Sequence, residues 1–301
     1  MGRTGSSGTS ARRPVTWLDV FTATPLTGNQ LAVVHDADGL DDATMLAFAR
    51  ETRLSETTFV QASTQPGADY RNRIWSMPGE LPFAGHPSLG TAVAVARARG
   101  ERVAHYVQQT PAGLQPIDVQ LHGDDAAWAS MLQEPPTFGD RAPRADVMAA
   151  AGLRATDAAP GFEPQVVSTG QPHLMAVLRD LAALNRAAPD AAALRALLEP
   201  LHAMVLYLAA VDLDVGTARA RGFFLDPDAV TEDPATGSAA GPLLAYLREH
   251  GGHDELTVVQ GIEIGRASAL DCAWEDDRPR VSGDVVVVGD GHLLLGTRSG
   301  S

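Results

Sequence analysis

Two stretches of the sequence are near copies of each other: His86-Pro87-Ser88-Leu89-Gly90-Thr91-Ala92 and Asp233-Pro234-Ala235-Thr236-Gly237-Ser238-Ala239. Each has a titratable residue, Pro, two variable residues, Gly, a hydroxyl residue and Ala, and the copies begin 147 residues apart in a chain of 301. An upstream pair repeats in the same order, at an offset of 144 residues at the alanine: Gly28-Asn29-Gln30-Leu31-Ala32-Val33 and Gly170-Gln171-Pro172-His173-Leu174-Met175-Ala176-Val177. Two ordered matches near half the chain length indicate one duplicated unit, in two copies rather than the many of a solenoid.

Each copy of the motif leads into an apolar segment, over residues 88–98 and 238–247. These segments are apolar on nearly every face, which is typical of a helix buried on all sides. A proline follows both His86 and Asp233, and the first turn of a helix tolerates proline because its amides are unpaired there. We therefore expect two buried central helices, with His86 and Asp233 at their N-termini.

The rest of the chain reads mainly as short strands, so each half is predicted to be a strand-rich shell around one buried helix, an α+β fold. We expect a disordered leader over residues 1–13, a first domain over 14–135 and a second over 136–301, whose last strand could return to the first domain. A linker rich in proline and charge is expected within residues 134–145. Solvent-side helices are predicted over two further segments, residues 41–53 and 191–198.

The composition is acidic, with a net charge of −14 and a pI near 4.9, which argues against a nucleic-acid or anionic membrane partner and favours a small ligand. All 23 basic residues are arginine, so Schiff-base, pyridoxal-phosphate and phosphate-loop lysines are excluded. The lone Cys272 cannot form an internal disulfide, which fits the cytoplasm. The N-terminal segment lacks the hydrophobic core of a signal peptide, and no stretch is apolar for the length of a membrane span.

Two helix starts suggest an active site in the cleft between the halves. The unpaired amides of residues 85–89 and 234–238, with the positive ends of two helix dipoles, would hold an anion such as a carboxylate. His86 and Asp233 differ chemically, so they could divide acid and base roles. Taken singly, each has an ordinary structural explanation, a helix-capping or core histidine and an N-terminal cap.

Glu56 is a third candidate, because it enters the apolar run Thr57-Thr58-Phe59-Val60. Local alternation favours the solvent face of a strand over a place in the cleft by about two to one. Several arginines could touch an anionic substrate, although exposed strand positions explain them as well: Arg71, Arg73, Arg219 and Arg221. The chain has no Gly-x-Ser-x-Gly elbow and no Gly-x-Gly-x-x-Gly fingerprint, and the spacing of His250 and His253 is weak for a metal site.

These motifs together resemble the phenazine-biosynthesis PhzF-like isomerase family, which has the diaminopimelate epimerase-like fold. The resemblance covers nearly the whole chain after the leader. Its carriers are Asp19-Val20-Phe21-Thr22, Gly28-Asn29, Leu54-Ser55-Glu56-Thr57, Leu81-Pro82-Phe83-Ala84-Gly85-His86-Pro87, Glu232-Asp233-Pro234-Ala235-Thr236-Gly237-Ser238-Ala239, Gln260-Gly261 and Gly265-Arg266. It implies two pseudo-symmetric domains, each a curled β-sheet around a central helix.

The resemblance also implies a chemistry. Glu56 would be the proton-transferring acid and base, and His86 and Asp233 would hydrogen-bond and polarise the substrate. Backbone groups of Gly85, Gly237 and Ser238, with the side chain of Ser55, would line the site. The implied reaction is a cofactor-independent isomerisation, similar to that of trans-2,3-dihydro-3-hydroxyanthranilate, in a homodimer and with no metal.

Two alternatives remain open from the sequence. One is a non-catalytic protein that keeps the cleft and binds a small metabolite. The other is a structural dimerisation module, in which His86 and Asp233 have no function. Epimerases and racemases of the implied fold use a pair of cysteines at the two helix starts, and one cysteine excludes that chemistry here.

Overall fold

The structure is a computed structural model that describes residues 11–226 and 229–295. Most of the predicted leader, residues 1–10, lies outside the described residues. Residues 11–13 were predicted to belong to the leader, but they already form the start of strand β1 (Ala11–Val20), where Ala11 to Arg13 pair with the end of strand β17 (Arg278–Leu295). No sequence pattern marked this start, because the pairing partner lies at the other end of the chain.

The first half of the chain forms a closed barrel of eight strands, in which β17 pairs with both β8 and β1 to close the ring. Helix α2 (Gly85–Arg99) runs through this barrel, and its residues 85–96 are all buried. The other strands, in ring order after β1, are β2 (Asn29–Val34), β3 (Thr57–Gln61), β4 (Tyr70–Trp75), β6 (Val103–Thr110), β7 (Gly113–Leu121) and β8 (Ala126–Leu132).

The second half repeats this topology around helix α6 (Gly237–Glu249). Its strands, in order of pairing, are β9 (Thr137–Arg141), β10 (Gln165–Ser168), β11 (Pro172–Leu178), β12 (Leu206–Asp212), β13 (Thr217–Asp226), β15 (Glu255–Gln260), β16 (Ser268–Glu275) and β17. Parallel pairs recur at equivalent places, β2 with β3 and β4 with β6 in one half, β11 with β12 and β13 with β15 in the other. The fold is therefore α+β with two pseudo-symmetric halves, as predicted.

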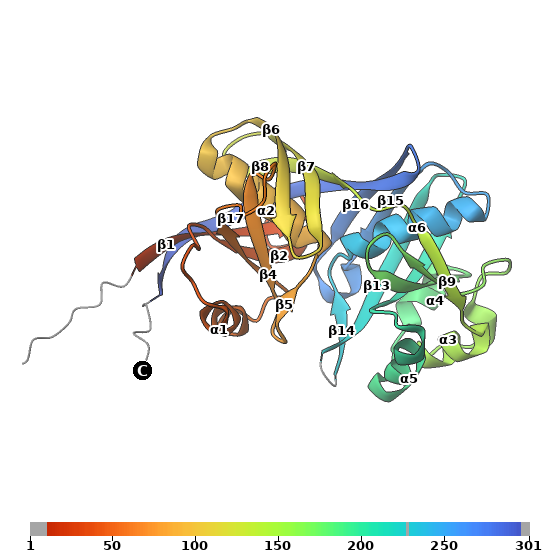
Figure 1. Cartoon of the computed structure of the whole chain (residues 1–301). Coiled ribbons are helices and arrows are strands. Elements are labelled where there is room, and N and C mark those ends of the chain that lie inside the picture. The colour runs from red at the N-terminus through yellow and green to blue at the C-terminus, as the bar shows by residue number, and fades with distance from the viewer. Residues whose placement is uncertain (1–10, 227–228, 296–301) are drawn as a thin grey trace, which may run out of the picture.

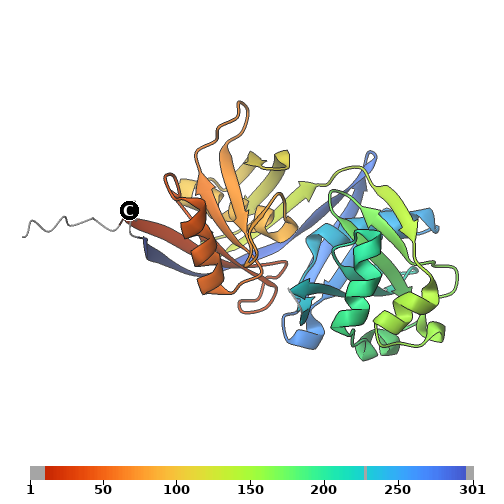
Figure 2. The same cartoon turned by 60° about the horizontal axis from the view of Figure 1, so that its bottom comes forward.

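Strand β17 joins the halves. Its beginning pairs with β16 and β8, and its end pairs with β1, so it runs from one half into the other (Figures 1 and 2). A boundary near residue 135 falls between β8 and β9, and the range of 134–145 in which a linker was predicted also contains β9. All five residues of β9 are exposed, so no apolar alternation marks this strand.

Shorter elements cover and connect the barrels (Figure 1). Both predicted solvent-side helices are present, and α1 covers one side of the first barrel while α3 to α5 lie on the second. The remaining elements are α1 (Asp42–Thr52), β5 (Glu80–Leu81), α3 (Arg144–Ala150), a 3-10 turn (Ala155–Asp157), α4 (Leu181–Arg186), α5 (Ala191–Leu201), β14 (Ala229–Asp233) and a second 3-10 turn (Ile262–Ile264).

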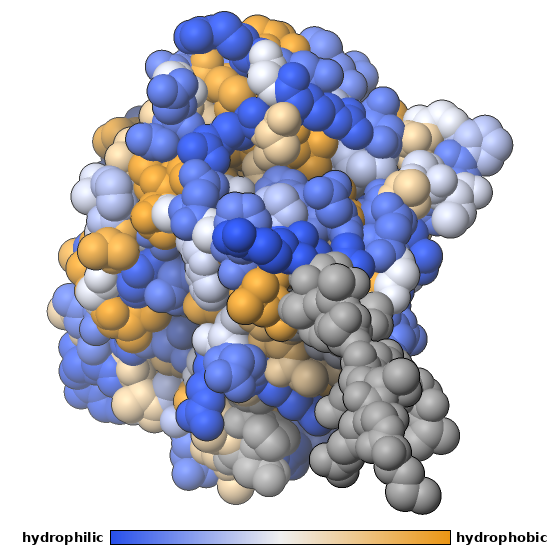
Figure 3. All heavy atoms as spheres, turned by 90° about the vertical axis from the view of Figure 1, so that its left-hand side faces the viewer, coloured by the Kyte–Doolittle hydropathy of each residue, from blue (hydrophilic) through white to orange (hydrophobic). Residues whose placement is uncertain are grey.

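The surface in Figure 3 intersperses hydrophobic residues with hydrophilic ones, a mixture that is ordinary for a folded protein facing water. In the part of the chain that the structure describes, no helix is long and apolar enough to cross a membrane. The largest continuous core includes both central helices, so the two barrels share one apolar interior.

Candidate active site

The two central helices begin against each other. The first helical residues are Gly85 of α2 and Gly237 of α6, preceded by Ala84 and Thr236 in non-helical conformations. A Cβ on Gly85 would lie 3.1 Å from the backbone nitrogen of Ser238 and 3.3 Å from the carbonyl carbon of Gly237. Glycine at this position therefore allows the close approach. Neither helix has a side-chain N-cap, so both leave first-turn amides and the positive ends of their dipoles for a ligand.

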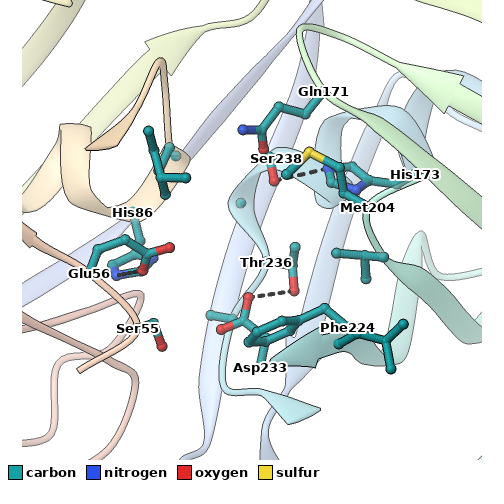
Figure 4. Close-up of a pocket in the computed structure, with 17 residues that line it drawn as sticks. Ser55, Glu56, His86, Gln171, His173, Met204, Phe224, Asp233, Thr236 and Ser238 are labelled. Carbon is teal, nitrogen blue, oxygen red and sulfur yellow. Dashed lines mark hydrogen bonds and ion pairs between the residues drawn. The ribbon is translucent and has the colours of Figure 1, made fainter. Parts of the chain in front are cut away.

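A cavity of about 250 Å³ opens between these helix starts (Figure 4). Every site residue predicted from the sequence lines it: Ser55, Glu56, Gly85, His86, Asp233, Gly237 and Ser238. The residues come from both halves, so the cavity exists only when the two barrels pack together. The structure thus places Glu56 in the cleft rather than on a solvent face, against the expectation from local alternation.

One part of the motif prediction is wrong. His86 is the second residue of α2, whereas Asp233 ends β14 and stands four residues before the first helical residue of α6. The strand extends to Asp233 because this residue pairs with Gly222 of β13. The two motif copies are therefore not equivalent residue by residue. Gly90 lies inside α2, while Gly237 begins α6.

Glu56, which is partly exposed, and His86, which is buried, form a pair on the side of the cavity that belongs to the first half (Figure 4). Glu56 Oε2 lies 3.4 Å from His86 Nε2, and neither atom makes a hydrogen bond within the described residues. Burial, with the negative charge of Asp233, raises the pKa of Glu56 to about 8. Burial lowers the pKa of His86 to about 3, opposed by a backbone hydrogen bond with Gln30. Near pH 7 the pair is therefore mainly a neutral carboxylic acid beside a neutral imidazole.

Asp233 faces this pair from the second half (Figure 4). Its Oδ2 accepts a hydrogen bond from Thr236 Oγ1 at 2.8 Å, and its Oδ1 accepts one from Asn29 Nδ2 at 2.8 Å. Burial raises the pKa of Asp233 to about 6, while the bonds from Thr236 and Asn29 lower it. Both carboxylate oxygens are thus held by donors, and one of those donors comes from the other barrel.

Gln260 fixes the segment between β14 and α6. Its Nε2 donates to the carbonyl of Asp233 at 2.8 Å and to Thr236 Oγ1 at 3.0 Å. Its Oε1 accepts from the backbone N–H of Thr236 at 3.2 Å and from the hydroxyl of Tyr207 at 2.8 Å. Because Gln260 donates to the Thr236 oxygen, the hydroxyl hydrogen of Thr236 is left for Asp233. The network therefore directs a donor at the Asp233 carboxylate.

Two of the four arginines that could have contacted an anionic substrate form ion pairs within the protein instead. Arg73 donates to Glu80 Oε2 at 2.8 Å, and Arg221 donates to Glu232 Oε2 at 2.6 Å. Both are buried and neither lines the cavity. The Arg73 pair joins β4 to β5, which leads to α2, and the Arg221 pair joins β13 to β14, which leads to α6. Glu232 directly precedes Asp233. These ion pairs are equivalent in the two halves and stabilise the approach to each helix start.

Ala235 and Thr236, within the segment whose amides were predicted to hold an anion, also line the cavity, and several other lining residues were not predicted: Leu81, Ala84, Gln171, His173, Met204, Val205, Phe224 and Leu225. Gln171 and His173 stand within the upstream repeat, which could have marked them. Met204, Val205 and Phe224 carry no motif, and only the folding of β12 and β13 beside α6 brings them to the cavity. Among the residues described, no group of three or more His, Cys, Asp or Glu side chains is placed to hold a metal ion.

The two halves contribute chemically different side chains to equivalent positions of the cavity. Ser55 and Glu56 directly precede β3, and Met204 and Val205 directly precede β12, the equivalent strand of the second half. The same position in the topology thus bears a carboxyl group in one half and a valine in the other.

Comparisons with known proteins match this picture. The model of the phenazine biosynthesis-like protein family matches residues 18–291. The chain is 36% identical over 287 residues to the trans-2,3-dihydro-3-hydroxyanthranilate isomerase of Pseudomonas aeruginosa, covering 94% of this chain and 97% of that protein. It superposes with a TM-score of 0.83 on a predicted epimerase from Pseudomonas aeruginosa, at 36% identity, covering 95% and 100% of the two chains. A PhzF-family protein of Bacillus anthracis gives a TM-score of 0.82 at 26% identity, over 95% and 100%.

Proposed function

The chain belongs to the phenazine biosynthesis-like protein family and is an isomerase, and from this premise we propose that it moves a proton within a small carboxylate-bearing substrate similar to trans-2,3-dihydro-3-hydroxyanthranilate, with Glu56 as acid and base. One observation carries the proposal. Glu56 and His86 both line the cavity, directly beside a place suited to an anion, and Glu56 Oε2 and His86 Nε2 lie 3.4 Å apart with no hydrogen bond to any other described residue.

The helix starts account for the anionic part of the substrate. The cavity lining that the structure describes includes no arginine, so no side-chain cation balances a carboxylate there. First-turn amides at Gly85, Gly237 and Ser238 supply hydrogen-bond donors instead, and two helix dipoles supply positive potential. A carboxylate at this point would lie between Glu56 and Asp233, one from each barrel.

The pKa of Glu56 suits a group that first accepts and then returns a proton. A value of about 8 keeps both protonation states accessible near neutral pH, which is where a general acid and base works best. In the proposed reaction, ionised Glu56 removes a proton from one carbon while the electron pair shifts into the conjugated system. The protonated carboxyl group then delivers the proton to another carbon, and the double bonds move. The substrate and product have the same atoms, so the step requires no oxidant or co-reactant.

His86 and Asp233 would polarise the substrate during this transfer. Neutral His86 can accept a hydrogen bond at Nε2 from the protonated carboxyl group of Glu56, whose Oε2 lies 3.4 Å away. Asp233, held on both oxygens, can accept from a hydroxyl or amino group of the substrate. Because Val205 occupies the position equivalent to Glu56, no second carboxyl group reaches the cavity from the opposite barrel at that point. We therefore expect a single group to carry the proton on one face of the substrate.

The test is isomerisation of trans-2,3-dihydro-3-hydroxyanthranilate in deuterated buffer by the natural protein and by Glu56→Gln. Loss of the carboxyl group should lower kcat by about a thousandfold and abolish solvent-derived deuterium in the product. Equal turnover by both proteins would refute the role of Glu56. Tight binding of the substrate by the natural protein, with neither turnover nor exchange, would favour the metabolite-binding alternative.

A further inference from the structure

We propose that His173 is a positioning residue that directs the hydroxyl hydrogen of Ser238 toward the substrate carboxylate, and so sets the affinity of the site for carboxylate ligands. This inference rests on the proposed function of the cavity. It concerns a residue of β11 that lines the same cavity as Asp233 and lies beside Ser238 (Figure 4).

The contact between the two residues is well defined. His173 is 1% exposed and lines the cavity, and its Nε2 lies 3.0 Å from Ser238 Oγ. Its other ring nitrogen, Nδ1, is buried and makes no hydrogen bond within the described residues. Burial, opposed by a backbone hydrogen bond with Ser238, lowers the pKa of His173 to about 3, so the ring is neutral and carries a single N–H.

The position of that hydrogen follows from the partners. With the hydrogen on Nδ1, a buried N–H donor would have no acceptor, which is rarer and more costly in proteins than an acceptor that lacks a donor. With the hydrogen on Nε2, His173 donates to Ser238 Oγ. The Nε2–H form therefore fits the site, and the Ser238 oxygen is an acceptor in this bond.

The hydroxyl hydrogen of Ser238 is then free for a ligand. No other hydrogen bond of Ser238 Oγ is made within the described residues, and Ser238 is the second residue of α6, beside the unpaired amides of the helix start. A carboxylate bound there would receive the Ser238 hydroxyl together with the helix amides. Because His173 donates to the Ser238 oxygen from the β11 side, the hydroxyl hydrogen of Ser238 cannot turn back toward β11. This hydroxyl is therefore oriented before the ligand arrives.

Two variants separate the donor from the ring. His173→Phe keeps a flat ring but removes the N–H, and His173→Gln places an amide N–H near the former Nε2. A matched control is His35→Phe, because His35 is also buried and its Nε2 lies 3.0 Å from a hydroxyl, Thr16 Oγ1, on strand β1 of the first barrel, away from the cavity. His173→Asn is a second variant without the bond, since its shorter amide cannot reach Ser238, and it serves if His173→Phe does not fold.

The test is calorimetric binding of two stable probes, 3-hydroxyanthranilate and its decarboxylated counterpart 2-aminophenol. His173→Phe should weaken binding of the carboxylate probe by about tenfold and leave 2-aminophenol unchanged, because a bond to a charged group is lost. His173→Gln should stay within about threefold of the natural protein, and His35→Phe should not differ from it. In a Ser238→Ala background, His173→Phe should have almost no further effect.

Other outcomes overturn the inference. Equal weakening of both probes would show that His173 only packs against the ligand. A full tenfold loss in the Ser238→Ala background would show that His173 does not act through Ser238. Failure of the natural protein to bind the carboxylate probe would refute both the subsite and this role. Normal carboxylate binding with no isomerase activity would instead refute the proposed function alone.

Discussion

The two halves of this protein share a backbone plan but differ in the side chains that they present to the cavity. The first half contributes Ser55 and Glu56 before β3, and the second half contributes Met204 and Val205 before the equivalent strand β12. The helix starts follow the same pattern of likeness and difference, because Gly85 and Gly237 are equivalent while only the first is followed by a histidine. Under the proposed function, symmetry is kept where anion binding would need two helix ends, and lost where proton transfer would need one group.

The polar side chains are also supported unequally. Asp233 receives donors from Thr236 and Asn29, and Gln260 holds its carbonyl. Glu56 Oε2 and His86 Nε2 lie 3.4 Å apart and make no hydrogen bond to any other described residue. The fully bonded carboxylate is suited to holding a substrate, and the under-bonded acid is suited to exchanging a proton with it. Each of the following predictions breaks or sharpens this comparison.

The largest expected effect concerns Glu56 and stability. The folded-state pKa of about 8 exceeds the ordinary value of 4.5, so between these values the unfolded chain ionises Glu56 while the folded protein does not. This term therefore lowers the free energy of unfolding as pH rises from about 4.5 to about 8, by about 5 kcal/mol. Glu56→Gln lacks it, so the variant should gain stability relative to the natural protein over this range, as measured by urea unfolding.

The control for this prediction is Glu275→Gln, because the exposed carboxyl group of Glu275 has a pKa lowered by Arg280. Its stability relative to the natural protein should show no such gain with rising pH. A pH-independent difference between Glu56→Gln and the natural protein would mean that folding does not change the pKa of Glu56.

The next effect concerns the shared geometry of the helix starts. Gly85→Ala would place a Cβ 3.1 Å from the backbone nitrogen of Ser238, so the two helices must move apart. Misplacement of the site by a fraction of an ångström should lower kcat/KM by about a hundredfold. Gly79→Ala, where nothing lies within 4 Å of the new Cβ, is the control and should retain activity. An active Gly85→Ala enzyme would show that the approach of the helices is not needed.

Removal of the Asp233 charge should lower the activity and should also lower the pKa of Glu56, on the opposite side of the cavity. Asp233→Asn is expected to lower kcat/KM by roughly ten- to a hundredfold. The rise of kcat/KM with pH, which reports ionisation of Glu56 near pH 8, should also move to lower pH, because Asp233 helps to raise the pKa of Glu56. Asp271→Asn, at an exposed carboxylate bonded to Thr257, should change neither quantity. An unshifted pH profile in Asp233→Asn would contradict the electrostatic coupling.

A smaller effect is expected from the support of Asp233. Gln260→Leu leaves the Thr236 N–H and the Tyr207 hydroxyl without their acceptor, and frees Thr236 from directing its hydrogen to Asp233. We expect about a tenfold loss in kcat/KM and a loss of about 2 kcal/mol in stability. Tyr207→Phe, which removes one outer bond, should keep most of the activity. Equal activity losses in the two variants would assign the effect to general packing.

The smallest effect is expected from a substitution that makes the second half more like the first. Met204 is 46% exposed, so Met204→Ser, which copies Ser55, should alter stability by less than about 0.5 kcal/mol. It should raise the KM by about threefold, because an apolar contact with the substrate is removed. Val215→Ser, at an exposed position outside the cavity lining, should leave KM unchanged. A large change in kcat for Met204→Ser would instead indicate that this side takes part in the chemistry.

The residue patterns supported the α+β duplication, both central helices and the pairing of His86 with Asp233 across the cavity, whereas Glu56 was assigned to the cavity only through the family resemblance. The central helices are recognisable because they are apolar on every face, which distinguishes them from the surface helices α1 and α5. Strand β9 was missed because exposed residues carry no burial pattern. The place of Asp233 was misjudged because the motif copies align by residue type, although β14 continues to Asp233 before the helix begins.

What the sequence by itself determined is the kind of fold and the chemical groups available, since periodicity and composition follow from which side chains are buried and which titrate. The tertiary structure alone decided that Glu56 lies beside His86, that Asn29 reaches Asp233 from the other barrel and that His173 backs Ser238. These contacts join residues far apart in the chain, and the raised pKa of Glu56 comes from the desolvation that their packing produces. Neither a distance nor a dielectric environment is encoded in local sequence spacing.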